Sequence, residues 1–115
     1  MSSPTQRSLA YLRQNGWTAC VVEKWNQYAR VRQDAFGFGD ILAVHLDDKN
    51  WFDVRHIALV QTTTAANMAA RRGKISVSLA ARQWRRAGGI VLLHGWAKRG
   101  PRGKRKKWEL TEEIL

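Results

Sequence analysis

The centre of the predicted sheet is residues 54–63, which read VRHIALVQTT. The middle of this segment is continuously apolar, which is typical of a strand that is buried on both faces. Gln61, Thr62 and Thr63 follow directly on the apolar run. Functional groups often lie where a buried strand ends. We therefore expect the central strand of a sheet here and a candidate site at its end.

The segments on either side of residues 54–63 predict an α/β fold. Upstream, the patterns favour a helix over residues 5–15, a strand over 18–25, a loop over 28–33 and a strand over 34–45. Downstream, they favour a helical stretch over 64–87 that Gly73 interrupts, a strand over 90–96 and a short strand over 107–110. The order αβββαβ implies a central mixed sheet flanked by helices, because a crossover helix separates strands three and four.

Length and charge limit the classes of protein to which this chain belongs. The 115 residues allow one domain, residues 1–115, and at 44% hydrophobic they are too apolar for a disordered basic tail. Lysine and arginine number 20 against 9 aspartate and glutamate residues, which gives a net charge of +11. Residues 58–115 hold 13 basic and 3 acidic side chains, so 13 − 3 = +10 lies in the second half. A polyanion is the expected partner of that half.

Cysteine usage and apolar content indicate an intracellular protein. Cys20 is the single cysteine, and no cysteine and histidine cluster has the spacing of a zinc site. The longest clean apolar runs have four residues, far below the roughly 20 that span a bilayer, and no signal-peptide apolar region is present. We expect a cytoplasmic location and no membrane partner.

The arrangement of the basic residues favours nucleic acid as the polyanion. Residues 98–107 hold seven basic side chains among ten residues, and Gly100, Pro101 and Gly103 predict a mobile turn there. A membrane-binding segment would place such charge along one amphipathic helix. We expect nucleic-acid contacts from Arg71, Arg72, Lys74, Arg102, Lys104, Arg105, Lys106 and Lys107.

Three tryptophans near the expected loops have two interpretations each. Trp108 follows the basic run, so stacking on a base and packing are equally good interpretations, and it is included among the nucleic-acid-binding candidates. For Trp25 and Trp51, packing within the fold is favoured and stacking on unpaired bases is the alternative.

A carboxylate is expected beside Gln61 at the edge of the sheet. Asp40 opens the second strand, and a hairpin between strands two and three would bring it close to Gln61. Side chains alternate along a strand, so Gln61 and Thr63 share one face and Thr62 lies on the other. Carboxylate, amide and backbone carbonyl oxygens suit Mg²⁺, which makes Asp40, Gln61 and Thr62 candidate metal ligands. The alternative is structural: turns, caps and ladder ends also use these residue types.

With these residues in place, the chain resembles the PD-(D/E)XK nuclease superfamily, which includes restriction endonucleases and Holliday-junction resolvases. In that family an acidic residue opens the second strand, and a (D/E/Q)xK triplet closes the third after an apolar run. Asp40 and the triplet Gln61, Thr62 and Thr63 match this layout, with 20 residues between Asp40 and Gln61. The αβββαβ order covers nearly the whole chain.

The family's additional upstream acid has two candidates in this chain. Glu23 lies in an expected strand, where pairing with an arginine is its usual role, and the resemblance makes it a ligand candidate. Asp34 lies beside Arg30 and Arg32, so a structural ion pair is its favoured interpretation.

The chain departs from the family pattern at three positions. Gly39 replaces the proline, Gln61 the second acid and Thr63 the lysine. The lysine change puts catalysis in question, because that residue orients the attacking water and offsets transition-state charge. Lys74 is the nearest replacement, but on a continuous helix it would lie roughly 15 Å further on unless Gly73 turns the chain back.

The resemblance implies a restriction endonuclease-like domain that hydrolyses phosphodiester bonds in DNA with Mg²⁺ or Mn²⁺. The implied catalytic residues are Asp40, Gln61, Thr63 and Glu23. It also implies a phage or bacterial protein, hence a bacterial host cytoplasm. So small a core favours structure-selective or nonspecific cleavage, or a homodimer that spans two strands. The alternatives are a noncatalytic nucleic-acid-binding module on the same fold and an RNA-binding protein that uses its aromatic residues.

Overall fold

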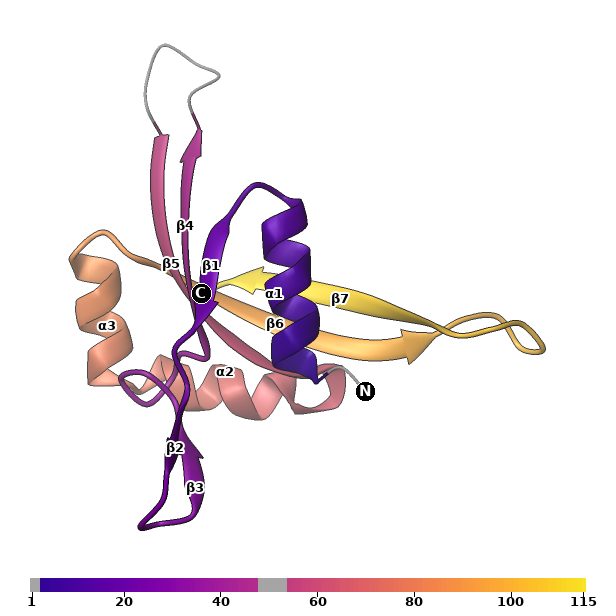
Figure 1. Cartoon of the computed structure of the whole chain (residues 1–115), viewed down its shortest axis with the longest axis horizontal. Helices are drawn as coiled ribbons and strands as arrows, with labels where there is room; N and C mark the ends of the chain where they lie inside the picture. Colours follow the sequence, from indigo (N-terminus) through magenta and orange to yellow (C-terminus); the bar gives the residue numbers. More distant parts are fainter. Residues whose placement is uncertain (1–2, 48–53) are drawn as a thin grey trace.

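A mixed five-stranded sheet forms the body of the protein, in a computed structural model that describes residues 3–47 and 54–115 (Figure 1). The strand order is β1-β4-β5-β6-β7. These strands are β1 (Thr18–Val21), β4 (Ile41–Asp47), β5 (Val54–Thr64), β6 (Ile90–Arg99) and β7 (Lys107–Ile114). The helices are α1 (Pro4–Gln14), α2 (Met68–Ser76) and α3 (Leu79–Arg86), with a 3₁₀ turn at Ala65–Asn67. The short strands β2 (Lys24–Asn26) and β3 (Val31–Gln33) form a separate hairpin.

The strand predicted to be central is β5, the third of the five strands. It pairs antiparallel with β4 and parallel with β6, which confirms the mixed sheet. The parallel pair needs a crossover, and α2 and α3 supply it. Leu59 and Val60 are almost fully buried at 2% and 0% exposure, as expected for a strand covered on both faces.

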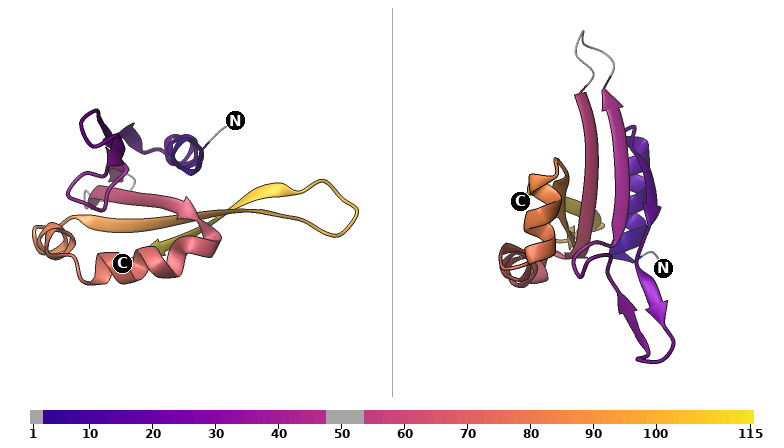
Figure 2. Two further views of the ribbon diagram at one scale, coloured as in Figure 1. Left: turned by 90° about the horizontal axis from the view of Figure 1, so that it is seen from below. Right: turned by 90° about the vertical axis from the view of Figure 1, so that its left-hand side faces the viewer.

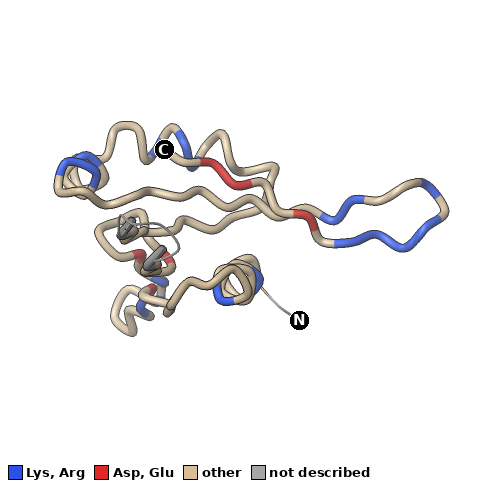
Figure 3. The backbone as a smooth tube through the Cα atoms, turned by 90° about the horizontal axis from the view of Figure 1, so that it is seen from above, with Lys and Arg blue, Asp and Glu red and all other residues tan. Residues whose placement is uncertain are grey.

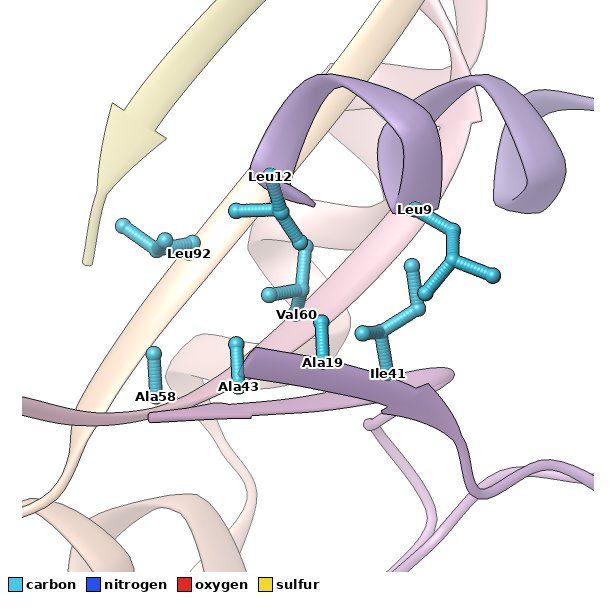
Figure 4. Packing of buried hydrophobic residues seen from close by; sticks show 8 residues of the cluster. All are labelled: Leu9, Leu12, Ala19, Ile41, Ala43, Ala58, Val60 and Leu92. Atoms are coloured by element: carbon cyan, nitrogen blue, oxygen red, sulfur yellow. The ribbon is translucent and has the colours of Figure 1, made fainter. Parts of the chain in front are cut away.

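Two hydrophobic clusters hold the helices against opposite faces of this sheet (Figure 2). On the α1 face the buried residues are Leu9, Leu12, Ala19, Ile41, Ala43, Ala58, Val60 and Leu92 (Figure 4). On the face covered by α2 and α3 they are Phe38, Leu59, Ile75, Ala81 and Val91. Because side chains alternate along β5, neighbouring residues of this strand supply both clusters.

The first helix agrees with the sequence prediction to within one residue at each end. Ser3 Oγ accepts a hydrogen bond from the backbone N–H of Gln6 at 3.2 Å, and Pro4 occupies the first turn, where its missing N–H costs nothing. The helix stops before Gly16, which adopts a φ of 87° that favours glycine.

The predicted interruption of the second helical stretch at Gly73 is wrong. Gly73 lies inside α2, where a glycine costs only about 1 kcal/mol relative to alanine. The break falls at residues 77 and 78 instead, and Ser78 Oγ begins α3 by accepting the N–H of Ala81 at 3.1 Å. Val77 is 81% exposed because it belongs to this link.

The predicted single strand over residues 18–25 is also wrong, and the predicted loop over 28–33 is a turn only as far as Arg30, where β3 follows. The chain leaves the sheet after β1, and β2 pairs with β3. Asn26 Oδ1 accepts the N–H groups of Tyr28 at 2.9 Å and Ala29 at 3.0 Å, which reverses the chain between the two strands. Residues 35–39 then form a tight loop, so the expected strand over 34–45 begins only at Ile41.

Three hairpins extend from the body in different directions (Figure 1). They are β2–β3, β4–β5 and β6–β7, and the molecule measures 47 × 44 × 25 Å along its principal axes. The far end of the hairpin β6–β7 extends past the helices (Figure 2), and β7 continues to Ile114 where the sequence predicted an end at residue 110. Within the described residues, no helix has the length and apolar character to cross a membrane.

Candidate functional site

A cleft of about 820 Å³ opens where β4 begins and β5 ends. The end of β5 supplies one wall, α2 another, and the N-terminus of α1 and the segment 23–40 complete it. The predicted site residues that line this cleft are Glu23, Asp40, Gln61, Thr62, Thr63, Arg71 and Lys74. The structure thus brings together every residue that the resemblance implies to be catalytic.

Asp40 is the centre of the cleft and is held from β5. Its Oδ2 atom accepts hydrogen bonds from Gln61 Nε2 at 2.7 Å, from the Thr62 N–H at 2.8 Å and from the Thr62 hydroxyl at 3.2 Å. The expected meeting of Asp40 and Gln61 is therefore confirmed. Gln61 and Thr62, expected as metal ligands, donate to the carboxylate in this arrangement and orient it.

Three carboxylates converge on this position. Oxygen atoms of Glu23, Asp34 and Asp40 all lie within 4.8 Å of one another, close enough to hold a metal ion. Such an all-oxygen set suits a hard divalent cation that keeps several of its waters. Both candidates for the upstream acid thus lie at the site. The expected arginine pair forms at Glu23, where Arg32 Nη1 lies 2.8 Å from Oε1.

Burial makes Asp40 a much weaker acid than an exposed aspartate when no cation is bound. The pKa of Asp40 rises from 3.8 to about 8, because the carboxylate is desolvated and because Asp34 and Glu23 lie beside it. The backbone N–H of Thr62 opposes this rise but does not cancel it. A divalent cation at this site would displace the Asp40 proton, since a metal binds the carboxylate form.

Gly39 explains why the chain can place Asp40 so close to β5. A Cβ atom at position 39 would lie 2.3 Å from Leu59 Cγ, so only glycine fits at this approach. The next residue begins the ladder, where the N–H of Asp40 donates to Val60 O at 2.8 Å. A proline at this position, as in the family pattern, would have atoms where Leu59 lies.

Lys74 reaches the cleft although Gly73 does not turn the chain. The reversal occurs earlier, in the 3₁₀ turn at Ala65–Asn67 directly after β5, so that α2 runs back against the sheet (Figure 2). Ile75, the next residue, is buried in the same hydrophobic cluster as Leu59 and holds this part of α2 against the sheet. The expectation that Lys74 lies far beyond the strand is therefore wrong.

The other two basic residues of α2 differ in their surroundings. Arg71 lines the cleft, as Lys74 does. Arg72 lies in an ion pair with Glu113 of β7, with Arg72 Nε 2.8 Å from Oε2. The hydrogen bonds from Arg72 lower the pKa of the Glu113 carboxyl. A phosphate contact by Arg72 would have to compete with this pair.

The predicted basic turn forms the tip of the β6–β7 hairpin (Figure 3). Residues 98–107 are exposed, and the Lys and Arg positions of this segment follow both strands of the hairpin out to its tip (Figure 3). Trp108 lies near the base of this turn and is 44% exposed. The guanidinium of Arg7 lies 3.6 Å from the centre of its ring, and Lys98 Nζ lies 5.4 Å from it. One face of Trp108 is thus covered by a cation rather than open to a base.

Replacing residues 104–107 with glutamine is expected to flatten the salt dependence of DNA binding. Each lysine or arginine that contacts phosphate adds about 0.9 to the slope of log affinity against log salt concentration, so the loss should reach several units. Replacing the three arginines of α3 is the matched control and should change the slope less. Equilibrium titrations at several salt concentrations measure both. An unchanged slope in the first variant would show that the tip does not contact phosphate.

A serine, a histidine and a glutamate also lie in contact, but the serine and the histidine are buried in the core. Ser8 Oγ lies 2.8 Å from His94 Nδ1, and His94 Nε2 lies 2.7 Å from Glu112 Oε2. Ser8 Oγ also accepts the indole N–H of Trp96 at 2.8 Å. Both Ser8 and His94 are 0% exposed, so no substrate reaches this hydroxyl. The network joins α1 to β6 and β7 and is structural.

Several residues of the cleft were not predicted from the sequence. Arg32 and Thr5 line it, and Thr5 Oγ1 lies 2.8 Å from Thr62 Oγ1. No local pattern marks either residue, because each reaches the cleft only through the packing of its element. The favoured interpretation of Trp25 as a packed residue is wrong, since this side chain is 60% exposed. Trp51 lies outside the described residues.

Fold and site together define an α/β domain with an acidic cleft at the ends of two central strands and basic residues around it. Comparison with family models, curated proteins and solved structures finds no significant match for this chain.

Proposed function

We propose that this protein is a metal-dependent DNA nuclease with a restriction endonuclease-like domain of the PD-(D/E)XK type. The observation that carries the proposal is the convergence of Glu23, Asp34 and Asp40 within 4.8 Å, in a cleft that Lys74 also lines. The strand order and the place of Asp40 directly before β4, beside the end of β5, support the same fold. A net charge of +11 supports a polyanionic substrate.

In this proposal the acidic residues hold Mg²⁺ or Mn²⁺. When bound, the ion supplies Lewis-acid stabilisation of the phosphate and lowers the pKa of a bound water. Gln61 and Thr62 keep Asp40 in position through their hydrogen bonds to Oδ2. Arg71, from α2, offers a guanidinium to the phosphate that enters the cleft.

Lys74 takes the role that Thr63 cannot perform. A threonine hydroxyl can position a water molecule but carries no charge to offset the transition state. Lys74 carries that charge and lines the same cleft from α2 instead of from β5.

The β6–β7 hairpin would hold the sugar-phosphate backbone of the DNA, without base-specific contacts. A homodimer would place two such clefts on the two strands of a duplex. The bacterial cytoplasm is the proposed location.

Cleavage of DNA in the presence of a divalent ion is the direct test. Purified protein is incubated with supercoiled, linear, branched and single-stranded DNA, each with Mg²⁺, Mn²⁺ or EDTA. We expect slow cleavage that Mn²⁺ supports at least as well as Mg²⁺ and that EDTA abolishes. Binding without cleavage of any form, equally strong in EDTA, would overturn the nuclease proposal.

Lys74→Ala is expected to lower the cleavage rate by roughly 10²- to 10³-fold, the loss that follows removal of one transition-state donor. Adding Thr63→Lys to this variant should restore part of the rate, because it returns an amine to the family's position on β5. Arg82→Ala on α3 is the control and should cleave at the wild-type rate. Single-turnover kinetics measure all three. A full rate in Lys74→Ala would exclude this lysine from catalysis.

The second candidate is a noncatalytic nucleic-acid-binding module on the same fold. It is favoured by Gln61 and Thr63, which replace the second acid and the lysine of the family pattern. In that case the acidic cluster would have a structural role, and DNA binding would not depend on the metal.

A further inference from the structure

The β2–β3 hairpin presents large aromatic side chains that neither hydrophobic cluster uses. Trp25 is 60% exposed and Tyr28 91% exposed, and Val31 beside them is 48% exposed. In the described part of the chain, β2 and β3 pair with each other and not with the five-stranded sheet. Packing within the protein therefore does not explain these residues.

The charge of the hairpin identifies the kind of partner that fits it. Residues 24–33 include Lys24, Arg30 and Arg32 and no acidic residue. All three basic residues are exposed. Flat aromatic rings interleaved with cations are the combination that binds unpaired nucleotides, because bases stack on the rings and phosphates meet the cations. An apolar protein partner would offer no counter-charge to Lys24 and Arg30.

The hairpin turn is ordered in a way that suits binding. Asn26 Oδ1 accepts the N–H groups of Tyr28 and Ala29, and Arg30 closes the turn with a φ of 55°. The two strands pair in register, with Trp25 opposite Arg32. A surface that is already ordered loses less conformational entropy when it binds.

Both ends of the hairpin lead into the acidic cluster. Glu23 precedes β2 and Asp34 follows β3, and both belong to the group of three carboxylates. Trp25 and its cross-strand partner Arg32 project from the same face of the hairpin, and Arg32 reaches Glu23 at the cleft. Trp25 lies two residues beyond Glu23, about 7 Å along an extended strand. A base stacked on Trp25 would thus belong to a nucleotide next to the cleft.

We propose that the β2–β3 hairpin binds an unpaired nucleotide strand, with Trp25 as its principal stacking surface. Lys24 and Arg30 contact the phosphates of that strand. In a continuous duplex the bases stack on one another, so the hairpin favours single-stranded, frayed or branched substrates. The inference deepens the proposed nuclease function by naming its substrate class. The binding itself does not require cleavage.

The test compares the binding of a short labelled single strand with that of its duplex, in EDTA so that no cleavage occurs. Trp25→Ala should weaken single-strand binding roughly 5- to 150-fold and duplex binding less than about twofold. Trp25→Phe should retain most of the affinity, because phenylalanine also stacks. Val77→Ala is the matched control, since Val77 is 81% exposed on the link between α2 and α3. It should bind both forms as the wild type does.

An unchanged single-strand affinity in Trp25→Ala, or an equal loss on single strand and duplex, would overturn the proposal. DNA and RNA strands of the same sequence are both tested, and the tighter one identifies the sugar that the site accepts. Trp25 lies outside both hydrophobic clusters, so circular dichroism of Trp25→Ala should match the wild type. The binding result is independent of whether the protein cleaves DNA, which separates failure of this inference from failure of the nuclease proposal.

Discussion

Asp40→Asn is expected to lower metal-dependent DNA cleavage by more than about 100-fold, since losing a residue that only orients a metal ligand typically costs about 10- to 100-fold. Asparagine keeps the shape of the side chain and an oxygen that accepts the Thr62 N–H, but offers no negative charge to a cation. DNA affinity should stay equal or rise, because a negative charge near the phosphate is removed. Cleavage and binding are measured on the same DNA, with Mg²⁺ or Mn²⁺ for cleavage and EDTA for binding.

The control for this variant is Glu109→Gln, which removes a carboxylate that is 55% exposed on β7 outside the cleft. It should cleave DNA at the wild-type rate. Asp40→Asn should also fold, because the buried Asp40 with a pKa of about 8 is already protonated near neutral pH without a cation. Cleavage by Asp40→Asn at the wild-type rate would show that Asp40 is not a metal ligand.

The metal-free protein is expected to lose stability as the pH rises from about 4 to about 8. The unfolded chain releases the Asp40 proton near 3.8, whereas the folded protein keeps it until about 8. Between these values the folded state binds more protons, so the free energy of unfolding falls with rising pH. Within this pH range, titration of Asp40 alone should lower the free energy of unfolding by up to about 1.4 kcal/mol per pH unit. Above about pH 8 this group should cause no further change.

Urea unfolding at a series of pH values in EDTA measures this effect. Asp40→Asn should flatten the decline, because asparagine does not titrate. Mg²⁺ or Mn²⁺ should raise stability most at pH 8, where the cation no longer competes with a proton. Glu109→Gln should keep the wild-type slope. A wild-type slope in Asp40→Asn would mean that another group causes the decline.

The meeting of Asp40 with Gln61 was predictable because it depends on one hairpin. The apolar residues of β4 and β5 must face the two hydrophobic clusters, and a slip by one residue would turn them outward. That requirement sets the observed pairing of Ile41 with Val60, which brings Asp40 and Gln61 together. The apolar pattern of these two strands was therefore enough to predict the contact between Asp40 and Gln61.

The hairpin β2–β3 was not predictable from propensity. β-branched and aromatic residues occur along residues 18–25 on both sides of the end of β1, at Thr18, Val21, Val22 and Trp25, so local strand preference does not mark where β1 ends. The N–H of Val22 still donates to Asp40 O at 2.9 Å, and only then does the chain leave the sheet. Asp34 consequently joins the acidic cluster although its neighbouring arginines suggested an ion pair.

The position of Lys74, on the other side of the cleft, was also not predictable from local sequence. Residues 65–67 have the alanine-rich composition of the helix that follows, so the sequence predicts one continuous helix after β5. Such a helix would carry Lys74 away from β5. A 3₁₀ turn and the burial of Ile75 in the cluster that contains Leu59 return Lys74 to the site. Tertiary packing overrides the local preference here.

The amino-acid sequence by itself determined the α/β class, the central strand, the pairing of Asp40 with Gln61 and the basic turn, because each depends on periodicity or on contacts within one hairpin. Only the tertiary structure decided that Glu23, Asp34 and Lys74 surround Asp40 and that Trp25 lies exposed beside them. These residues come from segments that meet through chain reversals at residues 35–39 and 65–67. The direction of the chain after each reversal depends on side chains from distant strands, such as Leu59, which lies against Gly39. Contacts of this kind cannot be predicted from the local sequence.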